Sequence, residues 1–202
     1  MKRPAVASVV VFLVIVVVFG AIAAAELVVR DGAPAVEVGS SSVPAASVND
    51  ELRAVAENED LADLVGAENV SIAPGSVVSG GASQIVTLIV LEELSRQYLD
   101  REGERITSAD RATGAEMLED TAFGQAWDGF PAWFRERYHD RFAVYAAFAR
   151  ALGGDFQSAT TERVVRREAR NTDIAVNPVY GRFAPAKLAV VPFPALSASD
   201  PG

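Results

Sequence analysis

Residues 82–102 read ASQIVTLIVLEELSRQYLDRE, and this stretch decides the fold of the chain. Its apolar residues recur at the 3.6-residue period of an α-helix, at Ile85, Leu88, Ile89, Leu91, Leu94 and Tyr98. Val86 and Val90 make the first half apolar on nearly every side, so we expect that half to be buried on most sides. Gly103 follows where helices commonly end. The pattern predicts a long central helix.

Three more helices are predicted on the C-terminal side of this stretch. Thr107-Ser108-Ala109-Asp110 has the spacing of a capping box, which opens a helix running towards Thr121. Pro131 suits the first turn of the next helix, whose stripe is Phe134, Tyr138, Phe142, Tyr145, Phe148 and Leu152. Gly153-Gly154 ends it, and a shorter helix is expected over 161–170.

The N-terminal side predicts two shorter helical segments. Ser47-Val48-Asn49-Asp50 has the spacing of a second capping box and follows a loop at 40–44. Asn58 to Asp60 ends or bends that helix, and residues 61–65 form a short amphipathic piece. Residues 66–82 are rich in Gly, Ser and Pro, which predicts a flexible loop before the central helix.

Strand patterns occur only near the two ends of this helical region. Residues 27–38 contain alternating apolar residues around a turn at Asp31-Gly32. Residues 174–176 and 188–191 are the C-terminal strand candidates. Strands at the two ends can pair and so bring the ends of the domain together. The predicted fold class is therefore mainly α with short terminal β-strands.

The first 25 residues predict an export segment. Lys2 and Arg3 precede an unbroken apolar run over 5–25, and the first acidic residue is Glu26. The run is long enough to span a bilayer as a helix, and its small-residue exit also fits a signal-peptide cleavage site. The sequence leaves two interpretations open, a retained signal anchor and a cleaved signal peptide. We expect a cell-membrane protein with an extracytoplasmic domain, or a secreted one.

Three regions follow from these patterns: the signal segment at 1–25, one helical domain at 26–193 and a disordered tail at 194–202. The chain has a net charge of −9 and no cysteine. An acidic chain is a poor match for nucleic acid, which needs a basic patch. Without cysteine there is no disulfide or thiol chemistry. No motif in the chain calls for a cofactor or a metal.

The order of elements, with Val38-Gly39 before the helix start at Ser47 and the closing Pro178-Val179-Tyr180-Gly181-Arg182-Phe183, resembles a known family. It is similar to the N-terminal chaperone domain of SurA/PrsA-type extracytoplasmic foldases, in a form that lacks the parvulin domain. The resemblance covers roughly residues 34–193. The turn before the first helix, Val38 to Val43, matches the family's "V-n-G-x-x-I" only approximately.

The resemblance implies binding of unfolded or translocated polypeptides outside the cytoplasm. The chain has no room for a parvulin domain beside the helical domain. Parvulin sites normally pair histidines, and His139 is the only histidine here. We therefore expect no prolyl isomerase activity and no catalytic residue.

Other patterns offer weaker chemistry. His139 is most simply an exposed helix histidine. Adjacent Glu92 and Glu93 point about 100° apart on a helix, so they do not face one another. Glu116 and Glu119 share a face and could serve a cell-envelope hydrolase, although a solvated helix surface explains them better. The arginine run from Arg163 to Arg170 could meet acidic lipid headgroups or a partner, but a solvated face is the simpler interpretation.

The candidate client-binding residues are Trp127, Phe130 and Trp133. They flank a loop that contains glycine, and if partly exposed they would form an apolar cleft for client side chains. The alternative is that they cap the core. A chaperone-like binding protein is the favoured function. A hydrolase using the helix carboxylates and a structural subunit of a membrane complex are the alternatives.

Overall fold

The computed structural model describes residues 34–65, 80–154, 156 and 158–192. Its helices are α2 (Ala45–Ala56), α3 (Glu59–Val65), α5 (Gly80–Glu102), α6 (Ser108–Glu119), α7 (Ala122–Gln125), α8 (Ala132–Ala151) and α9 (Ala159–Asn171). The 3-10 turns are η1 (Trp127–Gly129) and η2 (Pro178–Tyr180). The strands are β1 (Pro34–Val38), β2 (Ser41–Pro44), β3 (Ile174–Val176), β4 (Arg182–Ala184) and β5 (Ala189–Val191). The predicted class, mainly helical with a few short strands, is confirmed.

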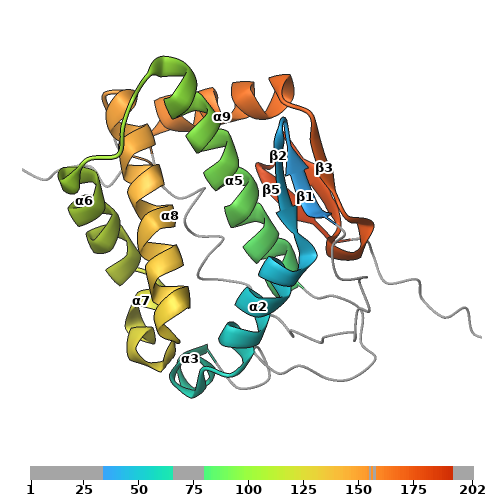
Figure 1. The fold of residues 1–202 in the computed structure, drawn as a ribbon, viewed down its shortest axis with the longest axis vertical. Helices are drawn as coiled ribbons and strands as arrows, with labels where there is room; N and C mark the ends of the chain where they lie inside the picture. The colour runs from blue at the N-terminus through green and yellow to red at the C-terminus, as the bar shows by residue number, and fades with distance from the viewer. Residues whose placement is uncertain (1–33, 66–79, 155, 157, 193–202) are drawn as a thin grey trace, which may run out of the picture.

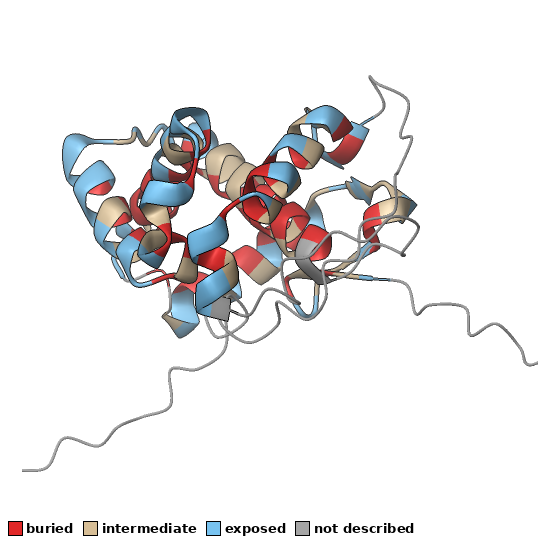
Figure 2. Cartoon of the chain, turned by 90° about the horizontal axis from the view of Figure 1, so that it is seen from below, coloured by how far each residue is buried: buried red, intermediate tan, exposed pale blue. Residues whose placement is uncertain are grey.

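Two long helices, α5 and α8, run side by side through the centre of the molecule (Figure 1). Val86 and Val90 in the first half of α5 are fully buried, as its apolar character predicted. α5 ends before Gly103, whose φ of +70° is the left-handed conformation that favours glycine. Figure 2 shows the buried residues on the inward faces of the helices, with exposed residues on the outer faces.

Helix α6 packs closely along α8 because Gly114 has no side chain. A Cβ on Gly114 would lie 2.6 Å from the backbone nitrogen of Ala143 and 2.6 Å from the carbonyl carbon of Phe142. The capping box predicted at the start of α6 is confirmed. The Thr107 side chain accepts from the Asp110 backbone, and the Asp110 carboxylate accepts from the Thr107 backbone at 2.7 Å.

The terminal strands pair as predicted. β1 lies between β2 and β3 in an antiparallel sheet, with Val36 opposite Val176 and Val38 opposite Ile174. β4 and β5 form a separate antiparallel pair. β5 matches the strand candidate at 188–191, whereas β4 was not predicted. The β1–β3 pairing joins two segments about 140 residues apart and closes the domain.

Two expectations for the N-terminal side were wrong. Residues 41–44, expected in a loop, form β2 because Gly39 adopts a φ of +56° and turns the chain back along β1. The first helix begins at Ala45, and its N-cap is Pro44 with no side-chain cap hydrogen bond. Ser47 therefore lies inside the helix, so its spacing to Asp50 does not make a cap.

Several predicted features lie outside the described residues. They are the signal segment at 1–25, the turn at 31–32, most of the loop at 66–82 and the tail at 194–202. Residues 80 and 81 belong to α5, so the end of that predicted loop is helical instead. Among the residues that the structure describes, no helix is long and apolar enough to cross a membrane.

Candidate functional site

The three predicted binding residues have different exposures. Trp133, in the first turn of α8, is 41% exposed. Trp127, in η1, is partly buried and packs its ring against the edge of exposed His139, with centroids 4.9 Å apart. Phe130 is only 3% exposed and belongs to the core. The two tryptophans are therefore at the surface. The ring of Trp127 packs against Phe130, and the ring of Trp133 packs against Phe134.

A column of stacked aromatic rings explains why Phe130 is buried. Phe130 stacks on Phe134, and Phe134 stacks on Tyr138, each pair with centroids 4.2 Å apart. Phe123 from α7 packs its edge against all three rings. Phe134 and Tyr138 stack because residues four apart lie on one face of a helix, and Phe130, in the extended segment just before α8, continues the stack. It holds the start of α8 rigidly beneath the tryptophans.

Trp133 has a charged neighbour as well as an apolar base. The Arg137 guanidinium lies over the Trp133 ring at 5.6 Å from its centroid, a cation–π contact. Leu64 of α3 is the other large apolar side chain exposed in the described chain, at 47%. α3 packs against α7 and η1, so both exposed side chains come from the same end of the molecule, the lower end in Figure 1. We call Leu64, Trp127 and Trp133 the aromatic end.

The aromatic column leads inwards to a buried charge centre. Arg141 of α8 is 2% exposed and Glu51 of α2 is 1% exposed. The two terminal nitrogens of Arg141 donate to the two carboxylate oxygens of Glu51, each at 3.0 Å. Arg141 Nε also donates to Glu92 of α5 at 2.8 Å, and the Tyr138 hydroxyl donates to Glu51 at 3.2 Å. One guanidinium thus joins α2, α5 and α8.

Electrostatics keep this centre charged. Burial alone would lower the pKa of Arg141, but the facing carboxylates of Glu51 and Glu92 raise it well above its ordinary value. Burial alone would raise the pKa of Glu92, but Arg141 and Arg96 together hold it below its usual range. Burial, with Glu51 nearby, raises the pKa of Tyr138 well above its usual range. Because Arg141 is paired with carboxylates from two other helices, removing any one partner would leave an uncompensated buried charge.

Sequence reasoning missed this centre. A signal was present, because Arg141 follows Tyr138 by three residues on the predicted buried stripe of α8. A charge on a buried stripe needs a partner. Its partner Glu51 lies 90 residues away, so the sequence alone does not identify it.

The acidic candidates differ in their surroundings. Glu116 and Glu119 are both exposed on the outer face of α6. Glu92 is committed to Arg96 and Arg141. Over residues 34–65, 80–154, 156 and 158–192, no group of three or more His, Asp or Glu side chains could hold a metal ion.

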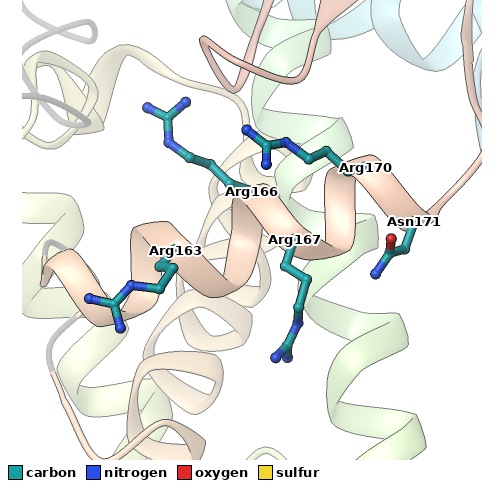
Figure 3. Close-up of a pocket in the computed structure, with 5 residues that line it drawn as sticks. All are labelled: Arg163, Arg166, Arg167, Arg170 and Asn171. Atoms are coloured by element: carbon teal, nitrogen blue, oxygen red, sulfur yellow. The ribbon is translucent and has the colours of Figure 1, made fainter.

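The predicted arginine run lies along α9 (Figure 3). Arg163, Arg167 and Arg170 are exposed, and Arg166 is partly exposed. Together with Asn171 they line an open groove.

Comparisons of this chain with protein families, with curated proteins and with solved structures find no match.

Proposed function

We propose that this chain is an extracytoplasmic chaperone-like protein that binds unfolded or translocated polypeptides and has no prolyl isomerase activity of its own. The observation that carries the proposal is the exposure of Trp133, with 41% of a large aromatic side chain in solvent. Exposed apolar side chains grouped at one place on a surface mark interaction sites. Here Leu64 of α3 and Trp133 of α8 lie at the aromatic end, where α3 packs against α7 and η1.

A rigid base and a mixed surface suit this role. The stacked column of Phe130, Phe134 and Tyr138 fixes the helix turn that carries Trp133. A preorganised anchor loses less conformational freedom on binding than a mobile one. Arg137 beside the ring adds a donor for the backbone carbonyls that an unfolded chain exposes. Such a surface favours binding of extended apolar segments and does not require a particular sequence in them.

The proposal also draws on the SurA/PrsA-like resemblance in the order of elements. A short strand leads into a helical body, and β3 returns to pair with β1. The apolar run at residues 5–25 supports a location outside the cytoplasm, tethered to the membrane or secreted.

The surface of Trp133 sets the size of the expected effect. A large aromatic buries up to about 250 Å², so the exposed fraction corresponds to about 100 Å² of apolar surface. At about 25 cal/mol per Å², covering it contributes at most about 2.5 kcal/mol to binding. We therefore expect Trp133→Ala to weaken client binding by up to about sixtyfold.

The test uses the full-length chain in lipid nanodiscs, titrated with a permanently unfolded, reduced and carboxymethylated protein that lacks tryptophan. The chain has two tryptophans, Trp127 and Trp133, and both lie at the aromatic end, so intrinsic fluorescence reports on this surface. A saturable shift that survives in Trp133→Phe and is lost in Trp133→Glu supports the proposal. Trp127 remains as the reporter in both variants.

Two outcomes would count against the proposal. Absence of any saturable shift, together with failure to suppress aggregation of a denatured protein, would sink it. Recovery of one stoichiometric membrane protein at native expression levels, with no binding of unfolded chains, would instead indicate a structural subunit of a membrane complex.

A further inference from the structure

Helix α9 concentrates positive charge on one face of a chain whose net charge is −9. The helix contains four arginines and two glutamates. At about 100° per residue, the arginines fall within an arc of about 100° on the side opposite its buried residues. We call Arg163, Arg166, Arg167 and Arg170 the arginine face (Figure 3). Segregation of this kind inside an acidic chain points to an anionic ligand.

Two of the four arginines form ion pairs within the described fold, and the other two do not. Arg166 pairs with Glu162 and donates to the Ala186 carbonyl, and Arg167 pairs with Glu168 at 3.2 Å. Exposed Arg163 and Arg170 make no ion pair with any residue that the structure describes. Their donor groups are therefore open to an external anion. Guanidinium groups match phosphate oxygens with two parallel hydrogen bonds.

If the apolar run is a retained anchor, the short stretch between it and the domain limits how far α9 can lie from the membrane. The run ends at Ala25, and β1 begins at Pro34. The eight residues between them, 26–33, let Ala25 and Pro34 lie at most about 30 Å apart. β3 follows α9 after two residues, and its first residue, Ile174, lies opposite Val38, which is four residues along β1 from Pro34, where the tether enters. That adds only about 13 Å along the strand. A short tether produces effective concentrations in the millimolar range, at which a weak contact is well occupied.

We propose that the arginine face of α9 docks on anionic phospholipid headgroups of the membrane that carries the N-terminal segment. This inference rests on the membrane tether in the proposed function and not on client binding. α9 lies towards the upper end of the molecule in Figure 1, whereas α3 and the aromatic end lie at the lower end. Docking through α9 would leave the aromatic end facing away from the bilayer, towards exported chains.

The experiment measures how close α9 lies to the headgroups. The chain has no cysteine, so Asn171→Cys provides a single attachment site for a fluorophore beside the arginine face. The labelled full chain is reconstituted into vesicles of phosphatidylcholine, alone or with about one third phosphatidylglycerol, that carry a headgroup quencher. We expect quenching at least about threefold stronger in the anionic vesicles. It should disappear at about 0.5 M salt, because salt screens exposed charges.

Paired variants separate this contact from general attraction. Arg163→Gln with Arg170→Gln should abolish the extra quenching. Arg53→Gln with Arg105→Gln removes the same charge from exposed sites outside α9 and should leave it intact. Equal quenching in the two lipids, or equal loss in both double variants, would overturn the proposal. So would loss of quenching on adding inorganic phosphate at matched ionic strength, because the face would then bind soluble anions.

Client binding is measured on the same variants by tryptophan fluorescence. It should be unchanged in Arg163→Gln with Arg170→Gln, because these residues lie outside the aromatic end. Failure of lipid docking with intact client binding therefore rejects only this inference. Loss of client binding with intact docking rejects only the proposed function.

Discussion

Replacing Arg141 with methionine is expected to destabilise the domain strongly, because it leaves a carboxylate buried without its main partner. Glu51 is 1% exposed and receives both terminal nitrogens of Arg141. In the variant it would retain Arg137, which is 40% exposed, and the Tyr138 hydroxyl. Methionine fills much of the arginine stem's volume, so the change removes charge and hydrogen bonds more than packing.

The expected loss follows from the burial of both groups. Removing one partner of a buried ion pair costs about 3–5 kcal/mol. Domains have unfolding free energies of about 5–15 kcal/mol, so this is a large share. In a chain of this size each kcal/mol shifts Tm by about 2–4 °C, which corresponds to a fall of about 6–20 °C. Glu92 contributes little to the loss of stability, because it keeps its ion pair with Arg96, whose Nη2 lies 2.8 Å from its Oε1.

Urea unfolding followed by circular dichroism measures this loss. Glu51→Met combined with Arg141→Met should be clearly more stable than Arg141→Met alone, because no uncompensated charge remains. Arg111→Met is the matched control. It breaks an exposed ion pair with Asp140 and should cost less than about 1 kcal/mol. A loss below about 1 kcal/mol in Arg141→Met, or a double variant no more stable than the single one, would refute the reasoning.

Three further changes test other parts of the structure. The pKa of Glu92 is depressed in the folded state. Ionised Glu92 therefore adds to the stability of the fold above its ordinary pKa of 4.5, and this stabilisation is lost as the pH falls through the folded-state pKa. The stability difference between the wild type and Glu92→Gln should thus be constant near neutral pH and shrink in acid, as measured by urea titrations from pH 7 to about pH 3. Gly114→Ala should lower stability by about 1–3 kcal/mol, because its Cβ meets the α8 backbone at Phe142, and a neutral result in thermal melts would contradict that close approach. Thr107→Ala should cost about 1 kcal/mol through loss of the cap on the Asp110 amide, with Thr107→Ser as the control that retains it.

Sequence patterns that act over a few residues predicted helix boundaries well. The C-terminal end of α5 follows from Gly103 and the start of α6 from the Thr107–Asp110 spacing, and each signal acts over a few residues. The same reasoning failed at Ser47, because the capping-box spacing marks a helix start only where the capping residue itself is outside the helix. There the chain leaves β2 at Pro44, and helix geometry begins directly at Ala45.

By itself, the sequence determined a mainly helical domain with paired terminal strands and the position of the aromatic residues along the chain. Periodicity and caps act locally, so the order of residues is enough to predict them. The tertiary structure alone decided that Phe130 is buried while Trp133 is exposed, because the α7–α8 packing around Phe123 selects which ring faces inwards. It also decided that Glu51 meets Arg141. That contact needs three helices packed together, and a buried charge specifies that a partner must exist without specifying where in the chain it lies.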